Sequence, residues 1–321
     1  MSMVDRLLGK RVADANGHLP ADAGLILDTT LLDRRRKPWE VVQLARELKR
    51  PHSLEIIEGV FERFQELHGD RAFRDDPAVI GGIATLESLG PVVVVAQQRG
   101  ESTEENIARN FGMPYPEGYR KAIRLYRIAE KFHLPLVTLV DTPGAYPGPE
   151  AEERGQAEAI AKSIEAMSRL RTPTVSVIIG EGGSGGALAL AVADVVLALQ
   201  NSIYSVISPE GCAAILWRSA TEAERAANAL KLDAPDLLEL GVVDALVPEP
   251  AGGAHTDHPA TIAAIKAALI AQLDRLARVP IGDLLSARYE RYRSIGVVIE
   301  PVPGASPPPK RPLWRRVIRR R

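Results

Sequence analysis

Short, mostly apolar runs recur along the middle of the chain, and each ends in polar or turn-forming residues. They occupy residues 91–96, 136–140, 175–179, 195–199 and 242–247. Runs of this length, bounded by turn residues, are typical of strands that are buried on both faces of a sheet. The pattern therefore predicts five buried strands in a core that begins near residue 78.

Helical periodicity separates most of these runs. It spans residues 117–132, 152–171 and 184–193, and two further helices are predicted at 259–278 and 281–295. Strands that alternate with helices form βα units with largely parallel pairing, so the chain is predicted to be an α/β protein. Amphipathic helices are also predicted before the core, at 39–48 and at 53–67, with Ser53 as the N-cap and Gly69 as the stop. Two strands lead into glycine-rich turns, a weak hint of a repeated ββα unit.

Composition narrows the class of protein. Hydrophobic residues make up 45% of the 321 residues, as in a globular protein. Cys212 is the single cysteine, which excludes an intrachain disulfide and a cysteine-cluster zinc site and fits a reducing compartment. The start of the chain is charged and the longest apolar run, 187–193, is too short to cross a bilayer. A soluble, cytoplasmic protein without a membrane span is expected.

Charge is distributed unevenly along the chain. Seven of the 40 basic residues lie in Lys310–Arg321, which has no acidic residue, so the first 309 residues carry 33 basic and 41 acidic side chains. Six prolines between Pro301 and Pro312 indicate an extended linker before this basic end. The tail is expected to be a solubilising, disordered end, or else a short amphipathic helix for an anionic surface or nucleic acid.

The stretch Gly180–Ala187 carries the most chemical information. It follows a predicted strand and opens a helix of small residues. Glycines let a ligand approach the main chain closely, and the first N–H groups of a helix have no internal partners. The stretch therefore predicts an anion or oxyanion site, although a tight turn with close helix–sheet packing would need the same residues.

Two nucleotide-binding patterns fail here. Gly180, Gly182 and Gly185 fit the dinucleotide fingerprint, but the next strand ends at Gln200 and Asn201, where an acidic residue would be needed to hold the ribose. No Lys-Ser or Lys-Thr pair follows the glycines, which excludes a phosphate-binding P-loop.

A serine hydrolase is a third possibility. Gly182-Gly183-Ser184-Gly185-Gly186 fits the nucleophile-elbow pattern, and Asp244 followed by His255 or His258 gives the right order of acid and base. Those histidines lie in a stretch that reads as a surface loop. The remaining interpretation needs no nucleophile: the N–H groups of Gly185 and Gly186 donate to a developing oxyanion, an interaction typically worth about 3 kcal/mol of barrier height.

Several motifs carry a resemblance to a known family. They are Arg109–Pro114, Pro116–Ala122, Asp141–Gly148, Ala151–Gln156, Gly180–Ala187, Tyr204–Cys212 and Pro248–His255. In this order they resemble the alpha-subunit family of bacterial acetyl-CoA carboxylase carboxyltransferases, which are biotin-dependent, and the likeness runs from about Trp39 to Gly296. The resemblance implies a ClpP/crotonase-like α/β spiral of ββα units with helical extensions at both ends. It divides the chain into a charged helical segment at 1–50, the carboxyltransferase core at 51–250, a helical segment at 251–300 and the tail at 301–321.

The resemblance also implies site residues. Gly185 and Gly186 would supply the oxyanion N–H groups, with help from the loop at Gly144 and Ala145. The remaining substrate-binding positions would be Tyr146, Gly182, Gly183, Ser184 and Ala187. No metal is expected on this chain.

The implied reaction uses partners. Carboxybiotin on a separate biotin carboxyl carrier protein would donate its carboxyl group to acetyl-CoA, giving malonyl-CoA, the first committed step of fatty acid synthesis. A beta subunit with a zinc ribbon would supply most of the acyl-CoA site in an alpha2-beta2 heterotetramer, and the complete enzyme, with its biotin carboxylase, binds ATP. The biotin nitrogen itself would take the α-proton, so no general base is needed on this chain.

A stand-alone crotonase-type acyl-CoA hydratase or hydrolase is the alternative within the same fold. It would need a carboxylate over the thioester, and Glu181, the acid next to the glycines, is expected to pair locally instead. The sequence departs from the family in its short region before Trp39, in Pro149-Glu150 after Gly148, and in its tail.

Overall fold

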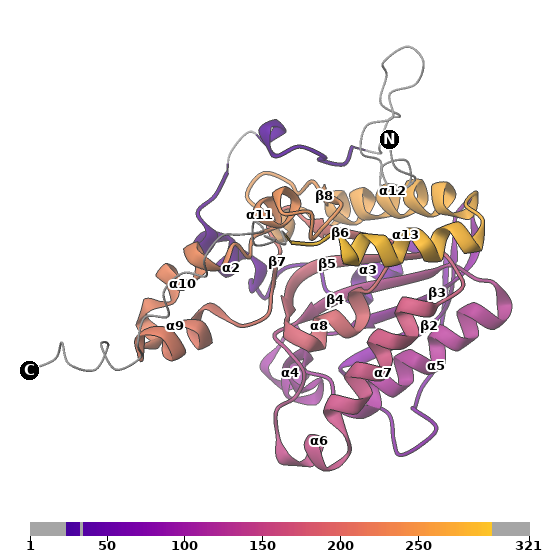
Figure 1. The fold of residues 1–321 in the computed structure, drawn as a ribbon, viewed down its shortest axis with the longest axis horizontal. Coiled ribbons are helices and arrows are strands. Elements are labelled where there is room, and N and C mark those ends of the chain that lie inside the picture. The colour runs from indigo at the N-terminus through magenta and orange to yellow at the C-terminus, as the bar shows by residue number, and fades with distance from the viewer. Residues whose placement is uncertain (1–23, 33–34, 297–321) are drawn as a thin grey trace, which may run out of the picture.

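The computed structural model describes residues 24–32 and 35–296 (Figure 1). The predictions made for the tail at 301–321 and for most of the first segment lie outside the described residues. One mixed sheet of eight strands forms the centre of the described part. Its strands are β1 (Arg63–Glu66), β2 (Val79–Leu86), β3 (Gly90–Gln97), β4 (Leu136–Thr142), β5 (Thr174–Gly183), β6 (Val195–Leu199), β7 (Ile203–Ser205) and β8 (Ala245–Val247).

The sheet is antiparallel at one edge and parallel elsewhere. The strand order is β1-β2-β3-β4-β5-β6-β8, with β7 paired to the end of β5. β1, β2 and β3 pair antiparallel, and every pair from β3 onward is parallel. The five predicted strands are confirmed as β3, β4, β5, β6 and β8, although only the last half of 242–247 is extended. Because parallel strands end at the same edge, the turns after β4 and β5 become neighbours.

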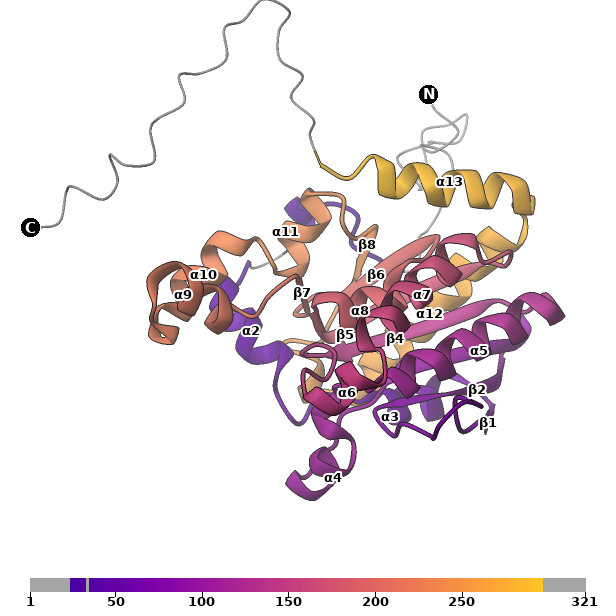
Figure 2. The ribbon, with the colours of Figure 1, turned by 60° about the horizontal axis from the view of Figure 1, so that its bottom comes forward.

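Helices cover both faces of the sheet (Figures 1 and 2). On one face lie α5 (Pro116–Phe132), α7 (Gln156–Arg169) and α8 (Ser184–Ala191), which share a buried apolar cluster with one side of the strands. On the other face lie α3 (Ser53–Val60) and α12 (His258–Ala277), which pack with α13 (Ile281–Arg293) in a second cluster. The strands are apolar on both sides because both sides are covered. The remaining helices are α2 (Pro38–Ala45), α4 (Thr103–Ala108), α6 (Pro149–Glu153), α9 (Pro209–Trp217), α10 (Ala223–Leu230) and α11 (Ala234–Glu239), with 3₁₀ turns η1 (Thr29–Leu31), η2 (Asn110–Gly112), η3 (Ala220–Glu222) and η4 (Ala254–Thr256).

The helix predicted over 53–67 is wrong in its second half. The backbone turns extended at Phe61, and Arg63–Glu66 form β1 along the open edge of β2. The backbone N–H and C=O groups at the edge of β2 pair with this segment and hold it as a strand. The spacing of its apolar residues is helical, so the sequence pattern does not reveal this pairing. Ser53 does not cap the helix either, since its hydroxyl donates to the Gln97 carbonyl at 2.6 Å.

The helix predicted over 152–171 is divided in two. Gly155 adopts a left-handed conformation with φ of 81°, which separates α6 from α7. Pro149 begins α6, a first-turn position where the missing N–H of proline costs nothing, so the unusual Pro149-Glu150 pair starts a short helix.

Arg288 joins α13 to the segments that lead into β5 and β6. Its side chain is buried and donates to both carboxylate oxygens of Asp194, each at 2.7 Å. It also donates to the carbonyl of Met167, in the last turn of α7, and to those of Leu170 and Thr172, between α7 and β5. One guanidinium therefore joins the C-terminal helix to the connections before β5 and β6.

Candidate functional site

Two backbone turns touch at the carboxyl ends of β4 and β5. A Cβ atom added to Gly183 would overlap the Pro143 carbonyl, and one added to Gly186 would stand 2.5 Å from the Ala145 nitrogen and 2.7 Å from the Gly144 carbonyl carbon. No side chain fits at either glycine without moving backbone. The structure thus brings Gly144 and Ala145 against the glycine-rich turn, the juxtaposition that the family resemblance implies.

The glycine-rich turn opens α8 with free donors. Gly183 occupies the N-cap position and has no side chain to accept from the first turn. The N–H groups of Ser184, Gly185 and Gly186 therefore have no acceptor within the helix, and the helix dipole places partial positive charge there. Ser184 is exposed, Gly185 is half-buried, and Gly186 and Ala187 are buried. This end of α8 suits an anionic oxygen that approaches from the side of Ser184 and Gly185.

Gln97 braces both turns from the end of β3. Its Nε2 donates to the Gly186 carbonyl at 2.8 Å, and its Oε1 accepts from the Asp141 N–H at 3.2 Å. The side chain is completely buried. Sequence reasoning missed this residue. The available signal was a polar residue directly after the apolar run 91–96.

Hydrogen bonds fix the loop after β4. The Thr142 hydroxyl donates to the Gly144 carbonyl at 2.7 Å and accepts from the Gly144 N–H at 3.1 Å. Tyr146 is held through its backbone by Pro114 and Gln156, while its hydroxyl donates to Glu150 at 2.9 Å. The Ala145 N–H makes no hydrogen bond within the described chain, so it remains a donor beside the start of α8.

A charged network lies at the same edge of the sheet. Glu181 accepts from Arg46 at 2.7 Å and lies 3.6 Å from Arg99. Arg99 lies 3.5 Å from Asp141, and His52 lies 3.7 Å from the other Asp141 oxygen. Burial alone would raise the pKa of Asp141, but Arg99 and His52 outweigh it and hold that pKa below its ordinary value. Glu181 is paired, as expected, and is not poised over a thioester.

The hydrolase constellation is not assembled. Asp244 accepts from the Val196 N–H and pairs with Arg291 at 3.0 Å. His258 places Nδ1 2.7 Å from Glu55 and Nε2 2.6 Å from the Lys49 carbonyl. Both ring nitrogens face acceptors, an arrangement that favours the protonated ring. His255 belongs to η4 and not to an open loop. Asp244 and His258 are therefore paired with groups other than Ser184.

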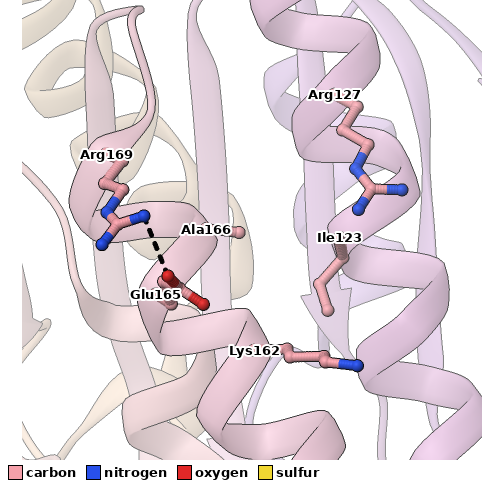
Figure 3. A pocket seen from close by; sticks show the side chains of 6 residues that line it. All are labelled: Ile123, Arg127, Lys162, Glu165, Ala166 and Arg169. Carbon is pink, nitrogen blue, oxygen red and sulfur yellow. Dashed lines mark ion pairs between the residues drawn. The ribbon is translucent and has the colours of Figure 1, made fainter.

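A separate groove lies between α5 and α7 (Figure 3). It has a volume of about 300 Å³ and is lined by Ile123, Arg127, Lys162, Glu165, Ala166 and Arg169. None of the predicted site residues lines it. Across residues 24–32 and 35–296, no group of three or more His, Cys, Asp or Glu side chains is arranged to hold a metal ion.

Comparisons with known proteins identify the family of the chain. Residues 31–296 match the family described as acetyl co-enzyme A carboxylase carboxyltransferase-like. The chain belongs to this family. The acetyl-CoA carboxylase carboxyltransferase subunit alpha of Thermus thermophilus is 57% identical over 299 residues, which cover 91% of this chain and 94% of the relative. The corresponding Methylococcus capsulatus subunit is 56% identical over 263 residues, 82% of each chain. The family is one of transferase subunits, so the chain is an enzyme subunit.

Solved carboxyltransferase structures share the fold. Transcarboxylase 12S superposes with a TM-score of 0.59 at 20% identity, over 77% of this chain and 46% of the longer one. The geranyl-CoA carboxylase beta subunit of P. aeruginosa gives 0.57 at 19% identity, over 82% and 49%. These matches confirm the crotonase-like fold of the acetyl-CoA carboxylase carboxyltransferase family. No helix in the described residues is long and apolar enough to cross a membrane.

Proposed function

We propose that this chain is the alpha half of the carboxyltransferase that moves a carboxyl group from carboxybiotin, carried on a separate protein, to acetyl-CoA. The product is malonyl-CoA. The family assignment and the names of relatives that are 56–57% identical support this reaction. The observation that carries the proposal in the structure is the start of α8, pressed against the Gly144–Ala145 turn.

The residues present fit carboxybiotin chemically. When bound, carboxybiotin releases its carboxyl group as CO2, and its ureido oxygen gains negative charge. The N–H groups of Gly185 and Gly186 donate to an oxygen at this place, aided by the dipole of α8. Gly144, Ala145, Tyr146, Gly182, Gly183, Ser184 and Ala187 shape the wall around it.

The two turns are rigid enough to act as preorganised donors. The Gln97 side chain is hydrogen-bonded to the backbone of both Gly186 and Asp141. The Thr142 hydroxyl is hydrogen-bonded to both the N–H and the carbonyl of Gly144. Donors that are already oriented need no reorganisation when charge develops, which is why such sites lower a barrier by several kcal/mol.

The chain is proposed to act with a beta subunit, in an alpha2-beta2 assembly served by a biotin carboxyl carrier protein and a biotin carboxylase in the cytoplasm. Large apolar side chains support a partner surface. Val206, Ile215 and Leu216 are 77%, 73% and 61% exposed, on α9 and the segment before it. This part projects from the body of the molecule (Figure 2), and apolar side chains gathered on a surface mark interaction sites.

Gly186→Val tests the site. The added side chain displaces the Ala145 nitrogen and the Gly144 carbonyl, so we expect carboxyl transfer in the complex with the beta subunit to fall by about 100-fold or more. Gly282→Ala is the control, since nothing lies within 4 Å of its added Cβ.

Turnover and complex mass are measured together. Near-normal turnover of Gly186→Val would show that these N–H groups do not carry the charge. A complex of normal mass with lost turnover supports the proposal, whereas loss of both would assign the turn a packing role.

A further inference from the structure

Tyr119, on α5, carries a hydroxyl that the proposed reaction has not yet used. The side chain is completely buried and its oxygen has no hydrogen-bond partner in the described chain. Burial, together with the nearby Asp76 carboxylate, raises the pKa of Tyr119 well above its ordinary value. The hydroxyl is therefore a protonated donor without an acceptor.

This hydroxyl lies close to Gly186, where the turn after β4 meets the turn after β5. The Tyr119 oxygen stands 3.0 Å from the point where a Cβ on Gly186 would lie, and the Ala145 nitrogen and Gly144 carbonyl carbon are 2.5 and 2.7 Å from that same point. The Tyr119 hydroxyl and the peptide that joins Gly144 to Ala145 therefore both border the space beside Gly186.

An idle hydroxyl at this place is unfavourable. A buried donor without an acceptor costs about 1–3 kcal/mol, and phenylalanine has the same shape without that cost. Packing alone therefore does not explain why this position has a tyrosine hydroxyl. The hydroxyl has a purpose if it gains an acceptor when a ligand occupies the site.

The Gly144 carbonyl is a suitable acceptor. It accepts one hydrogen bond, from Thr142, and a carbonyl oxygen has a second lone pair. On the other side of the same peptide, the Ala145 N–H has no acceptor within the described chain. A hydrogen bond to a peptide carbonyl polarises the peptide and strengthens its N–H as a donor.

We propose that Tyr119 is a positioning residue of the oxyanion site, which donates to the Gly144 carbonyl when an anionic oxygen binds beside Ala145. The bond orients the Gly144–Ala145 peptide and strengthens the Ala145 N–H toward the ligand. This inference rests on the proposed carboxyl transfer at the start of α8, and it adds to that site a residue of α5 to which the sequence analysis assigned no role.

Tyr126 provides a matched control on the same helix. It is equally buried, but its hydroxyl donates to the Ala189 carbonyl, toward the far end of α8, at 3.4 Å. Tyr126→Phe removes a hydrogen bond that exists in the free chain. Tyr119→Phe removes a hydroxyl that has no partner there.

The two variants are compared in the complex with the beta subunit by steady-state carboxyl transfer, and as isolated chains by thermal unfolding. We expect Tyr119→Phe to lower kcat about tenfold, the loss of roughly one hydrogen bond in the transition state, with KM for acetyl-CoA unchanged and Tm unchanged or higher. We expect Tyr126→Phe to lower Tm and leave kcat unchanged.

Other outcomes overturn the inference. A wild-type kcat in Tyr119→Phe means that the hydroxyl stays idle, and a fall in Tm together with kcat means that it acts only in folding. If the wild-type complex itself transfers no carboxyl group, the proposed function fails and this inference fails with it. If the wild-type complex is active and Tyr119→Phe has the same kcat, only the inference about Tyr119 is wrong and the proposed function stands.

Discussion

Some residues of the site can be recognised from a local sequence motif, whereas others can be recognised only from the packing in the structure. The glycine pair and Ser184 follow from the motif after a predicted strand, because helix-opening glycines have a local signature. Gln97 has none, and Tyr119, although it lies in the family motif Pro116–Ala122, carries no local sign of its place beside this turn. Gln97 lies 89 residues before Gly186, and Tyr119 lies on a separate helix, α5. A buried polar side chain looks the same in sequence wherever its partner lies.

Ser184 makes a sharp test at this scale. It begins α8 with φ of 53° and is exposed, so its position resembles that of a nucleophile, but neither Asp244 nor His258 is available to activate it. We expect Ser184→Ala to retain substantial turnover in the assembled enzyme, since the backbone N–H is kept.

Kinetics and a serine-reactive probe check this expectation. A loss of several orders of magnitude, or a covalent adduct at Ser184, would restore the hydrolase interpretation.

At the scale of elements, the buried strands were the most predictable and the edges the least. Strands β3 to β6 are apolar on both faces, so their runs stand out in sequence. β1 has exposed positions and a helical spacing of apolar residues, and it is a strand only because β2 offers it an open edge. The division of 152–171 depends on the backbone of one glycine, Gly155.

His258 joins two elements and gives the fold a pH dependence. It links the first turn of α12 to Glu55 of α3, and although burial alone lowers its pKa, the bonds to Glu55 and Lys49 raise it above the ordinary value. A pKa raised by folding stabilises the protein fully below the pKa of the unfolded chain, and this contribution is lost as pH rises through the folded value.

We therefore expect His258→Gln to reduce the free energy of unfolding at pH 6 and to have little effect at pH 9. Denaturant titrations of both chains at the two pH values measure the difference. His133→Asn, at the left-handed residue that ends α5, is the control and is expected to show no such dependence. An equal loss for His258→Gln at both pH values would contradict the assignment of a charged ring.

For the whole molecule, the described chain presents features that fit a subunit acting with a partner. It presents one helix-opening glycine turn, its neighbouring acid Glu181 is paired with Arg46 and Arg99, and apolar side chains on α9 face solvent. The family resemblance could be recognised from motifs spread over most of the core. The layered packing that brings β3, α5 and α8 to one point could not, because it depends on contacts between distant segments.

We expect the purified chain alone to be inactive toward acetyl-CoA and carboxybiotin, and to gain malonyl-CoA formation when it is co-purified with a zinc-ribbon beta chain. The assay follows product formation with each component alone and with both. Robust turnover by the lone polypeptide at low concentration would refute the need for a partner.

The clamp made by Arg288 has a consequence for the order in which a newly made chain matures on the ribosome. Asp194 is synthesised 94 residues before its arginine, and it is buried between α8 and β6. A buried carboxylate without its counter-ion is strongly unfavourable. We therefore expect the central sheet to reach its final form only after α13 has left the exit tunnel. Translation must pass Arg288 before the turns at the start of α8 are held in place, so chains released before α13 should not reach a state competent for assembly.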